Sequence, residues 1–215
     1  MTQADNPPLL ATVFSDYICP FCYVADARLQ RLRADYDLKI NWCFLEIHPE
    51  TPSAGMPIGE LGYPEPLWRR MMDSLDALAA EEGLAFLRHD FTTRSHQALL
   101  LAEAARAAGA AVFYRLHRRL FEAFFSEGRN IGDPDVLRAV ARECGLAEAM
   151  VAGAWEDPRH EQRLAEYRAA AQQLDVRATP TVFFGKQQRL DGVQPLAAFR
   201  DAAAAGLREQ QALRD

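Results

Sequence analysis

The sequence predicts an α/β fold in which one domain is interrupted by a large all-helical insertion. Three observations predict this class. Residues 1–50 show strand, helix and strand patterns in turn, residues 51–157 show a loop and then only helical patterns, and residues 158–215 return to strands after one more helix. We therefore expect residues 1–50 and 158–215 to form one domain, with residues 51–157 inserted into it behind a loop rich in proline and glycine.

A strand–helix–strand unit opens the chain. Residues 9–14 are a continuous apolar run with β-branched members that ends at Ser15-Asp16, as is typical of a short buried strand. Pro20 suits the first turn of a helix, where its missing N–H costs nothing, and the helical pattern extends over residues 20–36. Residues 38–45 form a second strand. Because the connections are short, we expect a right-handed unit with parallel strands.

The middle of the chain begins with a long irregular segment. Residues 51–66 contain four prolines and three glycines, and loops of this length in compact domains are usually lids or binding segments. Asp133-Pro134 and Asp157-Pro158 each place an N-cap residue before a proline at the first helical position. Helices are expected over residues 67–82, 93–108, 111–126, 134–144 and 158–174.

The end of the chain returns to a sheet. Residues 181–184 and 188–191 are short strand patterns around Gly185-Lys186, which indicates a hairpin, and residues 195–209 close the chain with a helix. Without the insertion, the element order is βαβ, then a helix, a ββ hairpin and a last helix. That order is the order of the thioredoxin fold, which is the fold we expect.

Composition and charge exclude some functions. The chain carries 30 acidic and 24 basic residues, for a net charge of −6, and it has no basic run, so a nucleic-acid partner is not expected. No apolar segment reaches the roughly 18 residues of a membrane-spanning helix. The polar start lacks the features of a secretory signal, so we expect a cytoplasmic protein. In that compartment a Cys-x-x-Cys motif is more often metal-binding or catalytic than structural.

Cys19-Pro20-Phe21-Cys22 lies where the first strand ends and the first helix begins. The nucleophile in disulfide exchange is a thiolate, and a helix N-terminus stabilises negative charge through its free N–H groups. Cys19 is at the exposed end of the motif and is expected to attack. Cys22, three residues later on the same side of the helix, is placed to resolve the mixed disulfide.

A zinc site is the competing interpretation of this motif. A structural zinc ion needs four ligands, usually from a second close pair, whereas Cys43 and Cys144 are solitary. We therefore expect no metal and no bound cofactor. Because free cysteines are among the most buried residues, Cys43 and Cys144 are expected to have packing roles.

Thr179-Pro180 leads directly into the apolar strand at residues 181–184. A proline before a strand is usually only a structural start signal. Together with the cysteine motif in this strand order, however, the segment resembles the cis-proline loop of thioredoxin-like proteins. In that loop the backbone before the proline pairs with an extended substrate.

The chain as a whole resembles the DsbA-like proteins of the thioredoxin superfamily, and among them the cytosolic FrnE-like branch. The resemblance runs from about residue 9 to about residue 205 and is carried by residues 14–23 (FSDYICPFCY), 47–52 (IHPETP) and 121–133. It implies a dithiol–disulfide oxidoreductase that acts on protein disulfides or on small thiols such as glutathione. By this resemblance Cys19 is the nucleophile, Cys22 the resolving thiol and Pro180 the cis-proline, with Thr179, Phe21 and Pro20 as substrate contacts.

Two features depart from the family pattern. Phe21 stands where the periplasmic enzymes have a histidine that helps to stabilise the thiolate, so we expect a less acidic Cys19 and a weaker oxidant. Some FrnE-like proteins also have a second cysteine pair near the C-terminus. This chain has none.

Further polar and aromatic residues have more than one interpretation. Asp16 is expected to cap, Glu46 is a candidate to take the proton of Cys22, and His48 is a loop contact or a second candidate. His96, His117 and His160 are expected on solvated helix faces. The aromatic residues of the insertion are expected to form its core, and some of them to line a groove over Cys19 together with Trp68 and the proline- and glycine-rich loop of residues 51–66. They are Phe113, Tyr114, Phe121, Phe124 and Phe125.

Two alternatives to disulfide exchange stay open. The first is a glutathione-dependent isomerase or kappa-like transferase, a group that typically has serine at the position of Cys19. The second is a redox-sensing chaperone or binding module whose aromatic groove holds unfolded chains. The cysteines at both motif positions favour redox chemistry. The substrate, the direction of electron flow and the oligomeric state are not determined by the sequence.

Overall fold

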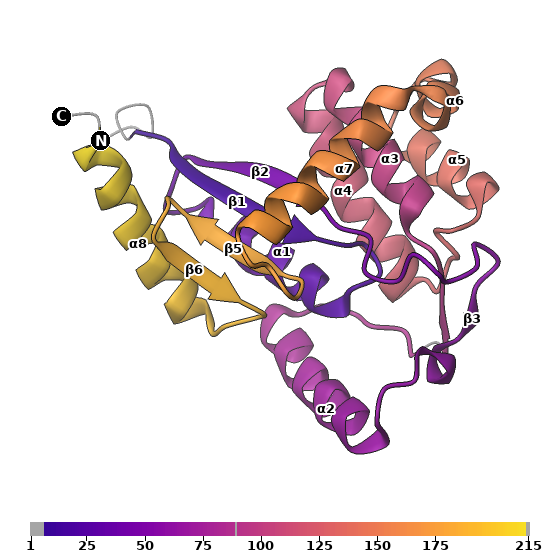
Figure 1. Ribbon diagram of the computed structural model, residues 1–215, viewed down its shortest axis with the longest axis horizontal. Coiled ribbons are helices and arrows are strands. Elements are labelled where there is room, and N and C mark those ends of the chain that lie inside the picture. The colour runs from indigo at the N-terminus through magenta and orange to yellow at the C-terminus, as the bar shows by residue number, and fades with distance from the viewer. Residues whose placement is uncertain (1–6, 89, 214–215) are drawn as a thin grey trace.

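The protein is described by a computed structural model that covers residues 7–88 and 90–213, so the outermost ends of the expected domain and residue 89 lie outside it. Its main sheet has the strand order β2-β1-β5-β6 (Figure 1). β1 (Leu9–Ser15) pairs in parallel with β2 (Leu38–Phe44) and antiparallel with β5 (Thr181–Phe184), which pairs antiparallel with β6 (Gln188–Asp191). This arrangement confirms the predicted thioredoxin-like fold with a helical insertion.

The central position of β1 explains its composition. Val13 lies opposite Trp42 on one side and Val182 on the other, and all three side chains are buried. A strand that is covered by neighbours and helices reads as an unbroken apolar run. The sheet thereby fixes the end of β1, from which the cysteine motif follows.

Three helices cover the sheet. α8 (Leu196–Ala212) packs against β1, β5 and β6 and touches α1 (Pro20–Leu32). α7 (Pro158–Gln173) packs against β2 and passes in front of the sheet in the view of Figure 1.

The insertion has two parts. α3 (His96–Ala105) lies among the helices α4, α5, α6 and α7, and eight of its residues are buried. α2 (Glu65–Glu82) contacts α1 and stands apart from that cluster, at the bottom of Figure 1. The remaining helices of the insertion are α4 (Ala110–Phe121), α5 (Pro134–Glu143) and α6 (Glu148–Glu156). The division of the chain at residues 50 and 157 stays a prediction.

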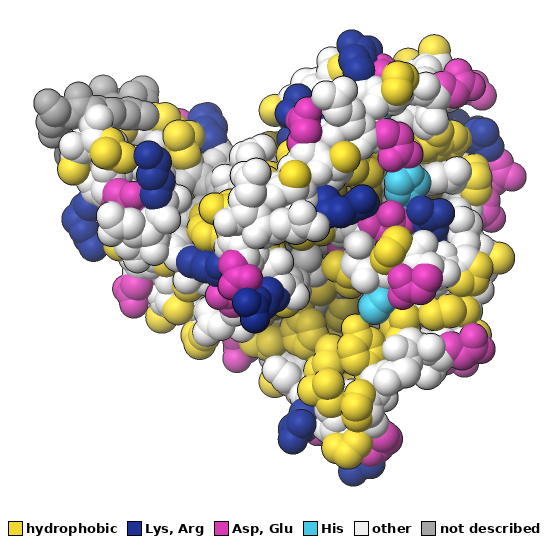
Figure 2. All heavy atoms as spheres, viewed as in Figure 1, with side chains coloured by type: hydrophobic (Ala, Val, Ile, Leu, Met, Phe, Trp, Pro, Cys, Tyr) yellow, Lys and Arg dark blue, Asp and Glu magenta, His cyan; other side chains and the backbone are white. Residues whose placement is uncertain are grey.

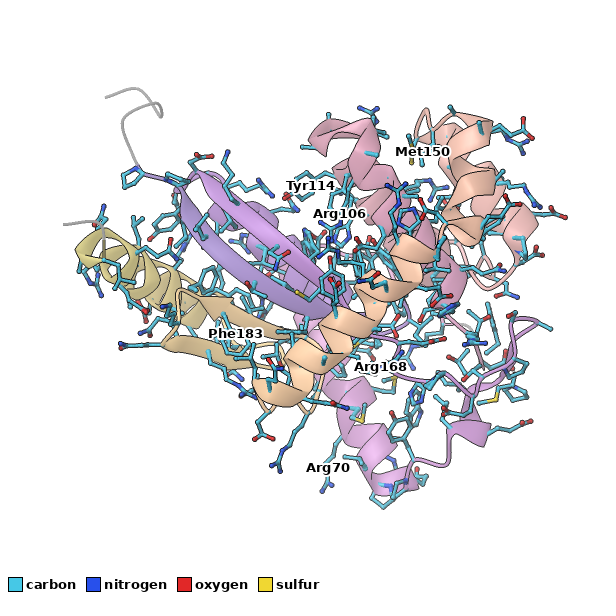
Figure 3. All side chains as sticks on the ribbon, turned by 45° about the horizontal axis from the view of Figure 1, so that its top comes forward. Arg70, Arg106, Tyr114, Met150, Arg168 and Phe183 are labelled. Carbon is cyan, nitrogen blue, oxygen red and sulfur yellow. The ribbon has the colours of Figure 1, made fainter. Side chains whose placement is uncertain are left out.

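Arg106 joins the insertion to the sheet (Figure 3). It lies in a short 3₁₀ helix (Arg106–Ala108) after α3, where it pairs with Glu103. Its Nη2 donates a hydrogen bond of 2.6 Å to the carbonyl oxygen of Trp42 on β2, and its guanidinium stands over the rings of Phe44 and Phe113. β2 is an edge strand of the sheet, so this contact satisfies a carbonyl that no neighbouring strand reaches.

Four details differ from the prediction. The first helix was expected to reach residue 36 but ends at Leu32, because the chain turns there to enter β2. α6 was not predicted, since its N-cap Ala147 makes no side-chain capping bond and gives no start signal. The helix expected over residues 111–126 changes to a π-helix at Glu122–Ser126. The loop expected over residues 51–66 contains a 3₁₀ helix (Ile58–Leu61) and the short strand β3 (Met56–Pro57), which pairs with β4 (Phe91–Thr92).

Gly206 allows α8 to approach β5. A Cβ atom at this position would lie 2.6 Å from the Cβ and 2.7 Å from the carbonyl oxygen of Phe184. We expect Gly206→Ala to lower the free energy of unfolding by about 1–3 kcal/mol, because helix and strand would have to move apart. Gly153→Ala in α6 is the matched control, since nothing lies within 4 Å of its added methyl group, and it should raise stability by roughly 0.5–1 kcal/mol. Urea unfolding measures the change in the free energy of unfolding for both variants. If the two changes had the same sign, this explanation of Gly206 would be wrong.

Candidate active site

The cysteine motif lies at the open end of α1. Cys19 is the N-cap residue in an extended conformation, Pro20 is in the first turn, and no side chain caps the helix. The first turn also contains no acidic residue. The N–H of Cys22 donates to the carbonyl oxygen of Cys19 at 3.0 Å, which holds the two cysteines in one turn. The positive end of the helix is thus available to a negative charge at Cys19.

The two thiols have opposite tendencies to ionise, although both are buried. A hydrogen bond from the Cys22 thiol lowers the pKa of Cys19 below its usual value, and the Thr179 side chain adds to that effect against the burial of the sulfur. The pKa of Cys22 is raised well above its usual value by burial and by the neighbouring Cys19. Cys19 is therefore the thiol that ionises, and Cys22 is the thiol that keeps its proton.

The loop before β5 faces the cysteines. Thr179–Pro180 is a cis peptide bond, and the Cys19 thiol donates a 3.4 Å hydrogen bond to the carbonyl oxygen of Thr179. Thr181 fixes this loop, since its hydroxyl donates to the carbonyl oxygen of Ala178 at 2.8 Å. The residues that the sequence singles out at its two ends are therefore brought together in one place.

Asp16 lies beneath the motif, fully buried, and does not cap α1 as was expected. Its Oδ2 accepts from the N–H of Ile47 at 2.8 Å and its Oδ1 accepts from the N–H of Ile18 at 3.3 Å. Burial raises the pKa of this carboxyl to about 6, although both backbone hydrogen bonds oppose the change. Of the two acidic residues considered from the sequence, Asp16 is the one that titrates near neutral pH.

Glu46 is occupied by other partners. Its buried carboxylate accepts from Arg94 Nε at 2.7 Å and lies 3.1 Å from Nδ1 of His96, whose Nε2 is 2.7 Å from Glu161. Burial favours the neutral acid, but the bonds from His96 and Arg94 outweigh it and lower the pKa of Glu46. Its role as a proton acceptor for Cys22 stays untested, and its observed role is to bind these two cations.

His117 was expected on a solvated face and is instead buried. Its Nδ1 is 2.8 Å from the hydroxyl oxygen of Tyr17, and its Nε2 is 3.6 Å from a carboxylate oxygen of Asp26 on α1. The arginines close to His117 in the sequence suggested that this side of the helix is exposed to solvent. The overlooked signal is the spacing of Phe113, Leu116, Leu120 and Phe121, which places residue 117 on the buried side of α4.

A largely apolar cleft of about 610 Å³ opens over Cys19. Figure 2 shows hydrophobic side chains gathered in a hollow above α2. The cleft includes Cys19 and the expected contacts Pro20, Phe21 and Thr179. The suggestion that aromatic residues of the insertion line a groove with Trp68 is confirmed for Phe124 and Phe125.

Other lining residues were not identified from the sequence. They include Met71, Met72 and Leu75, which continue the apolar side of α2 from Trp68. The loop of residues 51–66, which was expected to line the groove, contributes Ile58, Leu61 and Tyr63. A helix with apolar residues at positions 68, 71, 72 and 75 presents them on one side, so this spacing was the available signal. Nothing local in the sequence indicates that this side faces Cys19.

The described residues hold no cluster of histidine, cysteine or acidic side chains suited to a metal ion. Among the same residues, no helix is both long enough and apolar enough to cross a bilayer.

The fold and the paired cysteines define a protein of the thioredoxin-like class. Within that class, the family of DSBA-like thioredoxin domains matches residues 12–204, and the chain belongs to this family. It is 28% identical over 203 residues to the uncharacterized protein YwbO of Bacillus subtilis, with 93% of this chain and 96% of YwbO covered. The family is therefore that of DsbA-like thiol–disulfide oxidoreductases.

Solved structures share the fold. A probable DsbA oxidoreductase from Streptomyces coelicolor superposes with a TM-score of 0.81 at 22% identity, covering 94% of this chain and 91% of that one. The cytosolic disulfide reductase DsbM from Pseudomonas aeruginosa superposes with a TM-score of 0.67 at 21% identity, covering 95% and 100%. A second structure of DsbM contains glutathione, with a TM-score of 0.65 at 20% identity and coverage of 96% and 100%.

The Cys22 thiol is the largest cause of the lowered pKa of Cys19, which makes a matched pair of variants informative. In Cys22→Ala the pKa of Cys19 should rise, because only the backbone N–H remains as a donor at this position. In Cys22→Ser it should stay lower than in the alanine variant, since a hydroxyl can still donate. The pH dependence of alkylation at Cys19, read by peptide mass, measures both. Equal pKa values in the two variants would contradict the assignment.

The ionisation of Asp16 should appear in the stability of the fold. Its pKa is about 6 in the folded protein against 3.8 ordinarily, so the folded state holds the proton more tightly. The stabilisation that this carboxyl contributes is complete below about pH 4 and is lost as the pH rises through about 6. The stability deficit of Asp16→Asn relative to the unaltered protein should therefore shrink by about 2 kcal/mol between pH 4 and pH 7.

Urea unfolding across that pH range measures this difference. Asp73→Asn, which removes an exposed carboxyl from α2, is the control and should show no comparable change. A deficit of Asp16→Asn that is constant with pH would show that Asp16 does not titrate in this range.

Proposed function

We propose that the protein is a thiol–disulfide oxidoreductase in which Cys19 is the nucleophile and Cys22 the resolving thiol. One observation carries the proposal. The only one of the two thiols with a lowered pKa stands at the uncapped start of α1, 3.4 Å from the carbonyl oxygen before the cis-proline Pro180.

The reaction follows from these positions. The Cys19 thiolate attacks a disulfide R–S–S–R′, so that a bond forms between Cys19 and one substrate sulfur and the electron pair of the broken bond passes to the other. Cys22 then loses its proton and attacks Cys19, which releases the second thiol and leaves a Cys19–Cys22 disulfide. The raised pKa of Cys22 delays this second step until the mixed disulfide has removed the charge of Cys19. The reverse sequence oxidises a dithiol.

Substrate contacts are proposed around the same sulfur. The backbone of Thr179 offers an extended substrate a place beside Cys19, and Pro20 and Phe21 present apolar surface at the floor of the cleft. Protein disulfides and small thiols such as glutathione are the proposed partners. The structure of the related DsbM with glutathione supports a small thiol, and the description of DsbM as cytosolic supports a cytoplasmic location.

The decisive measurement is the redox equilibrium of the two cysteines. The protein is equilibrated in glutathione buffers of defined potential, and the Cys19–Cys22 disulfide is followed by thiol trapping and peptide mass, with Cys19→Ser as the control. We expect one reversible two-electron transition that the serine variant lacks.

The midpoint of that transition would rank the protein between thioredoxin-like reductants and DsbA-like oxidants. If no disulfide forms at any potential, the proposal is wrong. The glutathione-dependent isomerase or transferase and the chaperone would then be the remaining candidates, since neither requires this disulfide.

A further inference from the structure

The loop of residues 51–66 carries a hydroxyl group to the wall of the cleft that holds Cys19. Tyr63 and His48 both line this cleft together with Cys19. Tyr63 lines the cleft and keeps 39% of its surface exposed. Neither residue takes part in the exchange reaction as described above.

Tyr63 is held in place by its neighbours. Its hydroxyl oxygen is 3.2 Å from Nε2 of His48, and its ring stacks on Trp68 of α2 with the ring centres 6.0 Å apart. Nδ1 of His48 is 3.5 Å from a carboxylate oxygen of Glu50. The three side chains form a path from the cleft towards solvent, since most of the Glu50 side chain is exposed.

Tyr63 is also within electrostatic reach of the nucleophile. Its pKa is raised by burial and, next in size, by a thiolate at Cys19, with Glu50 contributing further. The other charged residues lining the cleft are Asp76, Arg88, Asp90 and Arg177. Both arginines are already paired, Arg88 with Asp76 and Arg177 with Asp175.

The exchange reaction requires stabilisation of the leaving sulfur on this side of the cleft. In disulfide exchange the three sulfur atoms lie nearly in line, so the leaving sulfur points away from Cys19 into the cleft. An alkyl thiolate is a poor leaving group, and exchange is faster when the leaving sulfur is less basic. A hydrogen-bond donor across the cleft would meet this need.

We propose that Tyr63 is a catalytic residue that donates a hydrogen bond to the leaving sulfur of the substrate, and that His48 is the positioning residue that holds the Tyr63 hydroxyl. When the Cys19 thiolate attacks R–S–S–R′, the pair from the broken S–S bond goes to the R′ sulfur. This sulfur accepts the hydrogen bond of the Tyr63 hydroxyl as it leaves as a thiolate, and it then takes a proton from water. In the oxidising direction the same hydrogen bond stabilises the thiolate of an incoming substrate. This assignment rests on the proposed function.

The test compares two uncharged disulfides that differ in their leaving group. Hydroxyethyl disulfide releases a basic alkyl thiolate, whereas dipyridyl disulfide releases an acidic thiol that needs no such hydrogen bond. Tyr63→Phe should slow mixed-disulfide formation at Cys19 about tenfold or more with the alkyl substrate. The rate with dipyridyl disulfide should stay unchanged, which also shows that the variant is folded.

Two further single variants and one double variant complete the test. Tyr36→Phe removes a hydroxyl at the opposite end of α1 and should leave both rates unchanged. His48→Gln should slow only the alkyl substrate, and the double variant with Tyr63→Phe should be no slower than Tyr63→Phe alone, because His48 acts through Tyr63.

Equal slowing with both substrates would overturn the assignment, because it would place the effect on Cys19 or on packing. So would an unchanged rate with hydroxyethyl disulfide. Under either result the unaltered protein still forms the Cys19–Cys22 disulfide in redox buffers. If the proposed function were wrong, that disulfide would not form at any potential.

Discussion

The uncapped start of α1 is the feature on which the rest of the site depends. A helix leaves its first N–H groups without partners, and this helix has neither a capping side chain nor an acidic residue in its first turn. Residues 16–19 alone separate it from β1, whose position is fixed by strands on both sides. The sheet therefore determines where the positive end of the helix lies, and Cys19 stands at that place. The Thr179 carbonyl reaches the same sulfur because β5 is the other neighbour of β1.

The insertion supplies what a small βαβ-ββα domain lacks, which is a second wall. The cysteines and the cis-proline loop lie on one side of the cleft, whereas α2, the loop before it and the π-helix at Glu122–Ser126 provide the other. The contact between Tyr17, His117 and Asp26 ties α4 of the insertion to the motif and to α1. A buried polar contact of this kind is costly to break, so it fixes the insertion relative to Cys19.

The sequence predicted features whose causes are local. The strand before the motif, the helix after Pro20 and the hairpin around Gly185 are each marked by residues at the element itself, and the observed strands β5 and β6 have the predicted bounds. α6 has no such marker, and the π-helix at Glu122–Ser126, in which Phe124 and Phe125 are buried, has no local signal in the sequence either. The residues of the site likewise divide into those with a local signal in the sequence and those without one. The cysteine motif is local, whereas the burial of Asp16 depends on the amide of Ile47 and the placement of Tyr63 depends on the path of a long loop.

Asp16 shows how stability and geometry oppose each other in this site. A buried carboxylate lowers stability above its pKa of about 6, and its charge also opposes ionisation of Cys19. Yet its two oxygens bind the N–H of Ile18, next to Cys19, and the N–H of Ile47, next to His48. One carboxyl group thus holds together two backbone segments that both line the cleft. An asparagine could accept only one of these bonds, because its amide nitrogen is a donor. The unfavourable charge therefore accompanies the two hydrogen bonds that hold the segment before Cys19 against the segment that follows β2.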